Sequence, residues 1–163
     1  MLSLLYRSQA VALLPQSELT DICLRSARKN QRLGITGFLV EYGGVFLQIL
    51  EGEPGTVESL YAEILRDPRH HDVELLLREE GKGKPNFGFW AMNYGPLDDP
   101  RFWEDAFGMP MDAGDFNQRS RDPDFALDVL SRAYLNAFAV ADVDSAVRAF
   151  VYGRLPNHLE RER

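Results

Sequence analysis

Cysteine is almost absent from this chain, and histidine is scarce. Cys23 is the only cysteine among 163 residues, and the only histidines are His70, His71 and His158. A disulfide within the chain is therefore impossible, and cysteine-rich metal sites are excluded. The three histidines do not have the spacing of zinc ligands either. We therefore expect a fold without disulfides or structural metal ions.

The chain also lacks a net positive charge and long hydrophobic runs. The 18 lysines and arginines are outnumbered by 25 acidic residues, which leaves a net charge of −7. Nucleic-acid binding normally needs a basic surface, so we expect no direct nucleic-acid partner. No apolar run is long enough to span a bilayer. The segment Met1–Arg7 also lacks the charged leader of a secretory signal. We therefore expect a cytoplasmic protein that does not bind membranes.

The rest of the composition is that of a globular protein. Hydrophobic residues make up 45% of the chain and charged residues 26%, which are ordinary values for a folded domain. A chain of this length can hold one domain of common size with a short appended element. We expect one core domain followed by an accessory tail.

Hydrophobic periodicity and turn residues predict an α+β fold. Apolar patterning predicts strands over residues 2–8, 35–41, 45–51, 73–78 and 87–94. One helix is predicted over 17–33, with Ser17 as its N-cap and Gly34 as its stop, and a second runs from the N-cap Thr56 to Asp67-Pro68. This βαββαββ order is typical of a ferredoxin-like sheet with both helices on one face.

The C-terminal part of the chain has a different pattern. The stretch 95–123 is rich in turn residues, and two further helices are predicted after it, over 124–137 and 142–152. Each carries an apolar stripe. We expect these helices to cover the bare face of the sheet or to form a dimer contact.

Gln48 lies inside the apolar run Val45–Leu50 and interrupts an otherwise buried strand. A buried amide needs several partners, because an unpaired polar group in a core costs on the order of 1–3 kcal/mol. The alternative is an edge strand from which Gln48 reaches solvent. The residues around Gln48 leave both interpretations open.

Three other polar residues could meet Gln48. The first and third strands are the central strands of such a sheet, so Tyr6, Ser26 and Asn30 could converge with Gln48 between the two helices. These side chains supply hydrogen-bond donors and acceptors but no nucleophile with a neighbouring base. The set suits a planar, hydrogen-bonding ring better than it suits hydrolysis.

Six segments carry a more specific pattern: Leu4–Ser8, Ser26–Asn30, Gly34–Leu39, Phe46–Gly52, Asp67–His70 and Phe87–Met92. In order and approximate spacing they resemble the BLUF family of flavin-binding blue-light sensors. The resemblance implies a BLUF domain over residues 1–97 that holds a flavin non-covalently between its two helices. The flavin would be FAD, with FMN the less favoured choice. Residues 98–163 lie outside the resemblance and would form a helical extension for signal output or oligomer contact.

The resemblance also implies a role for individual residues. Gln48 would lie between the N5/O4 edge of the flavin and Tyr6, and Asn30 would hydrogen-bond the pyrimidine edge. Light would drive electron transfer from Tyr6 to the flavin, with a proton following through Gln48. The rotated or tautomerised Gln48 amide would then red-shift the flavin absorption. The other implied cofactor-binding residues are Ile22, Ser26, Phe46, Asp67, Arg69 and His70.

An output path is implied as well. Trp90 and Met92 on the fifth strand would relay the change to the C-terminal helices, and from there to a separate partner protein or through a homo-oligomer. Such a protein is a photoreceptor and not an enzyme. Pro85-Asn86 and Glu63 stand where family members often carry basic residues. These departures keep FMN open beside FAD.

Two alternatives exist on the same fold. An acylphosphatase-like hydrolase would use Arg7 and Asn30, although residues 9–17 contain no glycine and so lack the phosphate loop that such an enzyme needs. A light-insensitive regulatory module would keep the fold and bind a partner through its C-terminal helices. Bound flavin distinguishes the photoreceptor from both.

Overall fold

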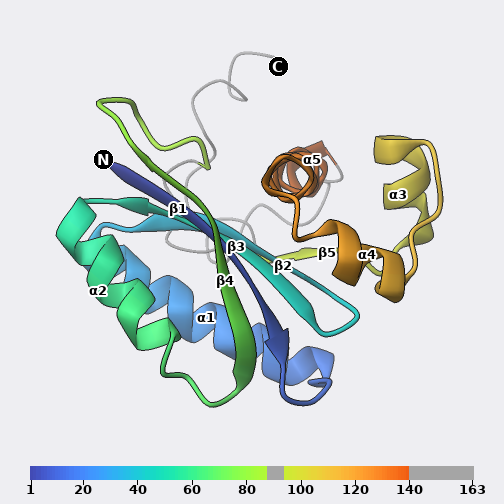
Figure 1. Ribbon diagram of the computed structural model, residues 1–163, viewed down its shortest axis with the longest axis horizontal. Helices are drawn as coiled ribbons and strands as arrows, with labels where there is room; N and C mark the ends of the chain where they lie inside the picture. The colour runs from blue at the N-terminus through green and yellow to red at the C-terminus, as the bar shows by residue number, and fades with distance from the viewer. Residues whose placement is uncertain (88–93, 140–163) are drawn as a thin grey trace.

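A mixed β-sheet forms the middle of the molecule (Figure 1). The structure is a computed structural model, and it describes residues 1–87 and 94–139. The strands of the sheet are β1 (Leu2–Ala10), β2 (Thr36–Tyr42), β3 (Val45–Gly52), β4 (His70–Glu80) and β5 (Tyr94–Pro96). The helices are α1 (Gln16–Leu33), α2 (Pro54–Ile64), α3 (Pro100–Phe107), α4 (Ala113–Arg119) and α5 (Pro123–Ala139).

The strand order is β4-β1-β3-β2-β5. β1 pairs antiparallel with both β3 and β4, β2 and β3 form an antiparallel hairpin, and β5 runs parallel to β2. The two-residue turn of the hairpin is Gly43-Gly44, where both residues have positive φ, as hairpin turns of this length favour. β1 and β3 are therefore interior strands, and every side chain on them faces one of two covered surfaces.

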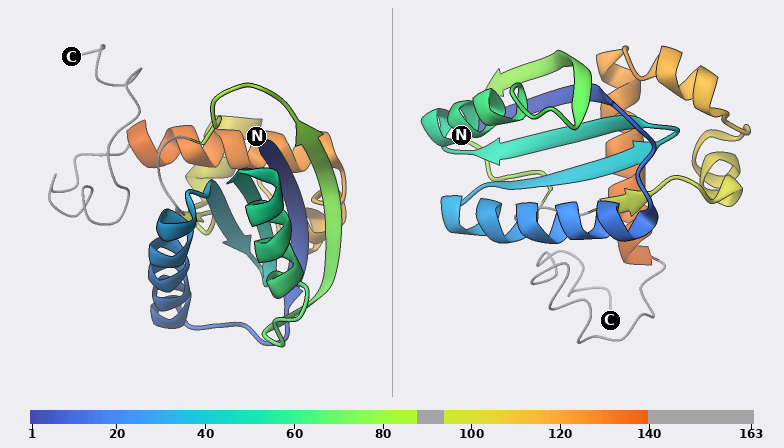
Figure 2. Two further views of the ribbon diagram at one scale, coloured as in Figure 1. Left: turned by 90° about the vertical axis from the view of Figure 1, so that its left-hand side faces the viewer. Right: turned by 90° about the horizontal axis from the view of Figure 1, so that it is seen from below.

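Helices cover both faces of the sheet, as the two side views show (Figure 2). α1 and α2 lie against one face, while α5 crosses the opposite face with α3 and α4 beside its start. This arrangement confirms the predicted ferredoxin-like α+β fold with C-terminal helices on the second face. The predicted helix over 142–152 and most of the predicted strand over 87–94 lie outside the described residues.

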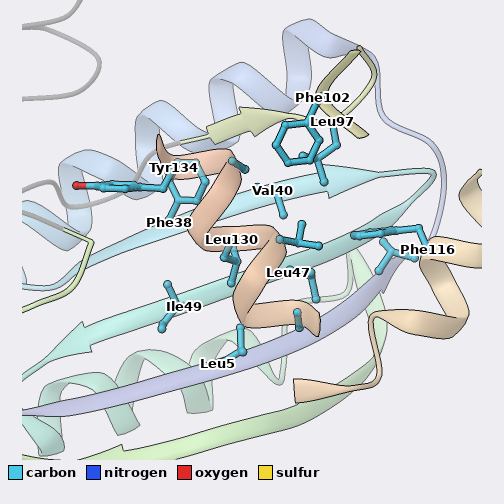
Figure 3. Close-up of a cluster of buried hydrophobic side chains, with 14 of the residues drawn as sticks. Leu5, Phe38, Val40, Leu47, Ile49, Leu97, Phe102, Phe116, Leu130 and Tyr134 are labelled. Atoms are coloured by element: carbon cyan, nitrogen blue, oxygen red, sulfur yellow. The ribbon is translucent and has the colours of Figure 1, made fainter. Parts of the chain in front are cut away.

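Strand alternation divides the apolar residues into two cores. The larger core joins the sheet to α3, α4 and α5, and includes Phe38, Leu47, Phe102, Phe116 and Leu130 (Figure 3). The smaller core lies under α1 and α2. Cys23 belongs to the smaller core, where burial raises the pKa of its thiol to about 12. The thiol is therefore a packing group and not a reactive one.

Two predicted helix caps are wrong. α1 begins at Gln16, and its N-cap is Pro15, which makes no side-chain hydrogen bond. The Pro15 carbonyl accepts the first helical hydrogen bonds, so Ser17 already lies inside the helix. α2 is capped by Glu53, whose carboxylate accepts the Thr56 N–H at 2.8 Å. Pro54 occupies the first turn, where a missing N–H costs nothing. The predicted stop at Gly34 is confirmed by its left-handed conformation.

The turn-rich stretch also contains two short helices that the periodicity did not predict. α3 is capped by Asp99 and begins at Pro100, and α4 is capped by Asp112. The two helices have eight and seven residues, about two turns each, so their apolar pattern is too short to stand out. Together they bury Phe102, Trp103 and Phe116 in the larger core.

Candidate functional site

Tyr6 and Gln48 form a buried hydrogen-bonded pair on adjacent strands. The β1–β3 register places the two residues directly opposite each other, and only 3% of Tyr6 and 7% of Gln48 is exposed. The Tyr6 hydroxyl donates a hydrogen bond to Oε1 of Gln48. β3 lies between β1 and β2, so the edge-strand interpretation of Gln48 is wrong.

A pocket of about 440 Å³ opens beside this pair, between α1 and α2. Its volume falls within the range of about 300–1,000 Å³ that is usual for small-molecule sites. All eight predicted cofactor-binding residues and Tyr6 line the pocket; the eight are Ile22, Ser26, Asn30, Phe46, Gln48, Asp67, Arg69 and His70. The predicted relay residues Trp90 and Met92 lie outside the described residues.

The interior of the pocket combines apolar walls with buried polar groups. Ile22, Leu39 and Phe46 supply apolar surface, while Gln48 and Asn30 supply amides; Asn30 is 2% exposed. Such a lining accommodates a flat ring that is apolar on its faces and polar at its edge. The donor set therefore fits the isoalloxazine ring of a flavin.

The electrostatic surroundings keep Tyr6 protonated. Burial raises the pKa of its phenol, and the negative charge that Tyr61 and Asp67 would carry raises it further. The Tyr61 ring packs against Tyr6 with 5.5 Å between ring centroids. At neutral pH Tyr6 is therefore a neutral phenol that donates a hydrogen bond and still holds the proton that an electron donor of this kind would release on oxidation.

Asp67, Arg69 and His70 form the rim of the pocket where α2 passes into β4. Side-chain hydrogen bonds from Arg69 lower the pKa of Asp67 to about 2, so this carboxylate is ionised at physiological pH. The Arg69 Nε lies 2.9 Å from Oδ1 of Asp67. His70 Nε2 lies 2.9 Å from the Ile64 carbonyl at the end of α2. All three side chains already have protein partners, so they shape the rim as a unit.

Sequence reasoning missed several lining residues, of which Ser8, Arg25 and Lys29 carry polar groups. Glu63, which the sequence singled out only as a departure from the family pattern, lines the pocket as well. Lys29 of α1 and Glu63 of α2 form an ion pair that joins the two helices. Arg25 and Lys29 lie one helical turn apart on either side of Ser26 along the sequence. This i, i+4 spacing of two cations beside a predicted pocket residue is the signal that could have identified them.

Arg7 points away from the pocket. Alternation along β1 puts Tyr6 and Ser8 on the pocket face and Arg7 on the other, where its guanidinium bonds to Glu74, Asn117 and Ser120. Asn30 lies on the pocket face. The arginine and asparagine required by the hydrolase alternative are thus separated by the sheet.

Comparison with known proteins decides the family. A family model described as "BLUF: Sensors of blue-light using FAD" matches residues 1–93, more than half of the chain. The chain belongs to the BLUF family. The matched residues therefore belong to a family of flavin-binding blue-light sensors, as the six sequence segments implied.

Individual BLUF proteins support this assignment. The chain is 41% identical over 71 residues to the photoactivated adenylate cyclase subunit beta of Euglena longa, an alignment that covers 44% of this chain and 8% of that protein. The structure of BlrB, a BLUF protein in its dark state, superimposes with a TM-score of 0.64 at 25% identity, covering 83% of this chain and 96% of that one. Klebsiella pneumoniae BlrP1 with FMN and cyclic diGMP gives a TM-score of 0.55 at 41% identity, covering 60% and 26%.

The chain thus spans only 8% of the length of the Euglena relative. Within the described residues, no helix has the length and apolar character needed to cross a bilayer.

Proposed function

We propose that this BLUF protein senses blue light through Tyr6 and Gln48, with FAD bound non-covalently in the pocket between α1 and α2. The buried hydrogen bond from the Tyr6 hydroxyl to Oε1 of Gln48, at the wall of that pocket, carries the proposal. Asn30 and Gln48 hold the polar edge of the ring. Ile22, Ser26 and Phe46 surround the ring, and the rim of Asp67, Arg69 and His70 closes the pocket near the ribityl chain.

When bound and excited by blue light, the flavin supplies a strong oxidant next to Tyr6. Tyr6 is the electron donor, and its proton leaves along the hydrogen bond to Oε1 of Gln48. Both return to Tyr6 at the end of the cycle. Gln48 keeps the change, because its amide can present either its oxygen or its nitrogen to Tyr6. Two discrete arrangements are stable because a buried amide that loses a partner pays the full cost of desolvation.

FAD is the proposed cofactor because the pocket rim carries cations that suit a diphosphate. Arg25 and Lys29 both line the pocket on the exposed side of α1. Lys29 is paired with Glu63, whereas Arg25 has no carboxylate partner within the described residues. Arg25 is therefore the cation free to meet a phosphate. The FMN in the BlrP1 structure makes FMN the second choice.

The same proposal assigns signalling roles to the rest of the chain. We infer that residues 1–97 form the sensor and residues 98–163 the output extension, with Trp90 and Met92 as relay. The output is a contact with a separate partner protein or a rearrangement within a homo-oligomer in the cytoplasm. The protein itself acts as a photoreceptor and not as an enzyme.

Difference spectroscopy tests the proposal. The full chain is purified, loaded with FAD, and its visible absorption is recorded in the dark and after blue illumination. Wild type and the exposed control Gln31→Ala should show a reversible red shift, whereas Gln48→Ala should bind FAD without the shift. A normal shift in Gln48→Ala would remove Gln48 from the mechanism. Flavin uptake without any shift in wild type would favour the light-insensitive regulatory module.

A further inference from the structure

The Ser8 hydroxyl is buried against the pocket without a protein partner. Ser8 is 1% exposed and lines the pocket. Its Oγ has no hydrogen-bond partner among residues 1–87 and 94–139. A buried hydroxyl is normally hydrogen-bonded, so an unpaired one that faces a ligand pocket points to a bond with the ligand. No other part of the proposed mechanism uses this group.

The position of Ser8 on β1 indicates which part of the ligand it meets. Ser8 follows Tyr6 by two residues on the same strand face, so it lies about 6.5–7 Å further along the pocket wall. It stands opposite Phe46 in the β1–β3 register. Beyond it, Ala10 pairs with His70 at the rim. Ser8 therefore lies between the Tyr6–Gln48 pair and the rim.

We propose that Ser8 Oγ donates a hydrogen bond to a ribityl hydroxyl of the bound flavin. The inference rests on the proposed function, in which Gln48 and Asn30 take the polar edge of the ring. The next polar groups of a flavin beyond the ring are the ribityl hydroxyls. A serine hydroxyl complements these groups because each can donate and accept. Ser8 thus contributes to cofactor affinity and selects flavins that carry a ribityl chain.

Paired ligands test this contact. Dissociation constants for riboflavin and for lumiflavin, which has the ring but no ribityl chain, are measured by fluorescence titration of the apoprotein. Ser8→Ala should weaken riboflavin binding by about three- to tenfold, the effect of one hydrogen bond, and leave lumiflavin unchanged. Ser59→Ala on the exposed side of α2 is the control and should change neither constant.

The outcomes separate this inference from the proposed function. An equal loss for both ligands would place the contact on the ring, and no loss for either would leave Ser8 without a ligand role; both overturn the inference. Wild type that binds FAD and shows the red shift in the same preparation still supports the proposed function. Thermal unfolding of the apoprotein provides the folding control, and Ser8→Ala should be at least as stable as wild type because it removes an unpaired buried hydroxyl.

A second, independent observation concerns Arg7, which is completely buried. Its Nη2 donates to Oδ1 of Asn117 at 2.6 Å, its Nε to Oγ of Ser120 at 3.2 Å, and its Nη1 to Oε1 of Glu74 at 3.0 Å. Asn117 belongs to α4, and Ser120 caps the C-terminal end of that helix. Gln9 Nε2 of β1 also donates to Oδ1 of Asn117, at 3.2 Å, but only Arg7 bonds to both Asn117 and Ser120 within the described residues.

The backbone around Arg7 is irregular. The β1–β4 pairing shifts register between Leu5 and Tyr6 and again between Arg7 and Gln9. Such irregularities often lie next to functional residues, where they redirect side chains. Tyr6 and Arg7 are neighbours on this segment and project to opposite faces. A displacement of β1 at Tyr6 must therefore move the guanidinium or break its bonds to α4.

We propose that Arg7 couples the light-driven change at Tyr6 and Gln48 to α4. This inference also rests on the proposed function, and it makes α4 an output element that is reached through β1. A buried guanidinium favours two discrete states over gradual loosening, because each broken bond leaves a charge without a partner. Arg7 is a positioning residue and does not contact the cofactor.

Hydrogen exchange measured by mass spectrometry, in the dark and under blue light, tests the coupling. Wild type should show light-dependent exchange in residues 113–123, and this change should be lost in Asn117→Ala and in Arg7→Met, while the flavin red shift persists in both. Arg121→Met is the control, since Arg121 pairs with the same Glu74 but makes no bond to Asn117 or Ser120 in the described structure. It should keep the light response.

Two results would overturn the coupling. One is a wild-type protein that red-shifts without any change of exchange in α4, and the other is a full α4 response in Asn117→Ala. Asn117→Ala decides the question if Arg7→Met does not fold, because it truncates a half-buried side chain of a short helix and leaves the β1 sequence unchanged. Gln9→Ala is then the second control, since Gln9 Nε2 donates to the same Oδ1 of Asn117 at 3.2 Å, and it should keep the light response. Loss of flavin binding by wild type would count against the proposed function instead.

Discussion

Removal of the Glu51 carboxylate should destabilise the fold far more than removal of an exposed carboxylate. Glu51 is completely buried on β3. Its carboxylate accepts hydrogen bonds from Ser3 Oγ at 3.3 Å, Asn86 N at 3.1 Å, Asn86 Nδ2 at 3.2 Å and Phe87 N at 3.0 Å. The Glu51 carboxylate therefore attaches Asn86 and Phe87, which precede Trp90 in the sequence, to β3, the strand that carries Gln48.

The size of the stability loss follows from the hydrogen-bond donors that Glu51→Ala would leave without an acceptor. Two of them, Ser3 Oγ and Phe87 N, are buried, and each buried donor left unpaired costs about 1–3 kcal/mol. Water can reach the half-buried Asn86 groups. The expected loss is thus about 4 kcal/mol, which corresponds to a fall in Tm of about 8–16 °C for a domain of this size.

Thermal and urea unfolding of the apoprotein measure this loss. Glu79→Ala on the exposed end of β4 is the matched control, and it should change stability by no more than about 0.5 kcal/mol. Glu51→Gln should fall between the two, because an amide keeps one acceptor but turns an N–H group toward the donors. Equal stability of Glu51→Ala and Glu79→Ala would refute the reasoning.

Two further predictions concern the sheet. Gly37→Ala should lower the free energy of unfolding, measured in urea, by more than about 3 kcal/mol, because the new Cβ would fall on the backbone carbonyl of Ile49, which cannot move aside. Gly83→Ala is the control and should be nearly neutral, since a Cβ there would meet nothing within 4 Å. Equal effects of the two substitutions would contradict the close approach of Gly37 to Ile49. Burial raises the pKa of the Tyr6 phenol above its ordinary 10.0. The contribution of the protonated phenol to the free energy of unfolding is therefore intact below pH 10 and is lost as the pH rises further. Wild-type stability should then fall more steeply than that of Tyr6→Phe between about pH 10 and about pH 11, and parallel curves would contradict a buried phenol.

The central elements of the fold could be predicted because their local signals agree with the tertiary structure. Val45–Leu50 is a strand whose apolar residues meet two cores, and Gly34 ends α1 in the conformation that glycine favours. α3 and α4 were missed because seven or eight residues hold too few helical turns for a periodic pattern. Their caps, Asp99-Pro100 and Asp112, were the better signal.

The site could be predicted only where its residues lie on elements with strong local signals. Alternation along β1 and β3 predicts that Tyr6 and Gln48 share a face of the sheet, and the resemblance to the BLUF family implied that they are neighbours. The structure places them directly opposite each other. The contacts of Arg7 could not be predicted, since its partners Asn117 and Ser120 lie more than a hundred residues away and on helices with weak local signals. A charged residue inside a strand normally predicts an exposed face, whereas here a network of hydrogen bonds buries it.

The dark and illuminated absorption spectra of flavin-loaded Tyr6→Phe test the central claim most directly. The substitution removes only the hydroxyl that donates to Gln48. Tyr42→Phe is the control, because the Tyr42 hydroxyl donates to the Met111 carbonyl away from the pocket. We expect a reversible red shift in wild type and Tyr42→Phe and none in Tyr6→Phe, although all three bind flavin. A full red shift in Tyr6→Phe would contradict the assignment of Tyr6 and Gln48 as the photoactive pair.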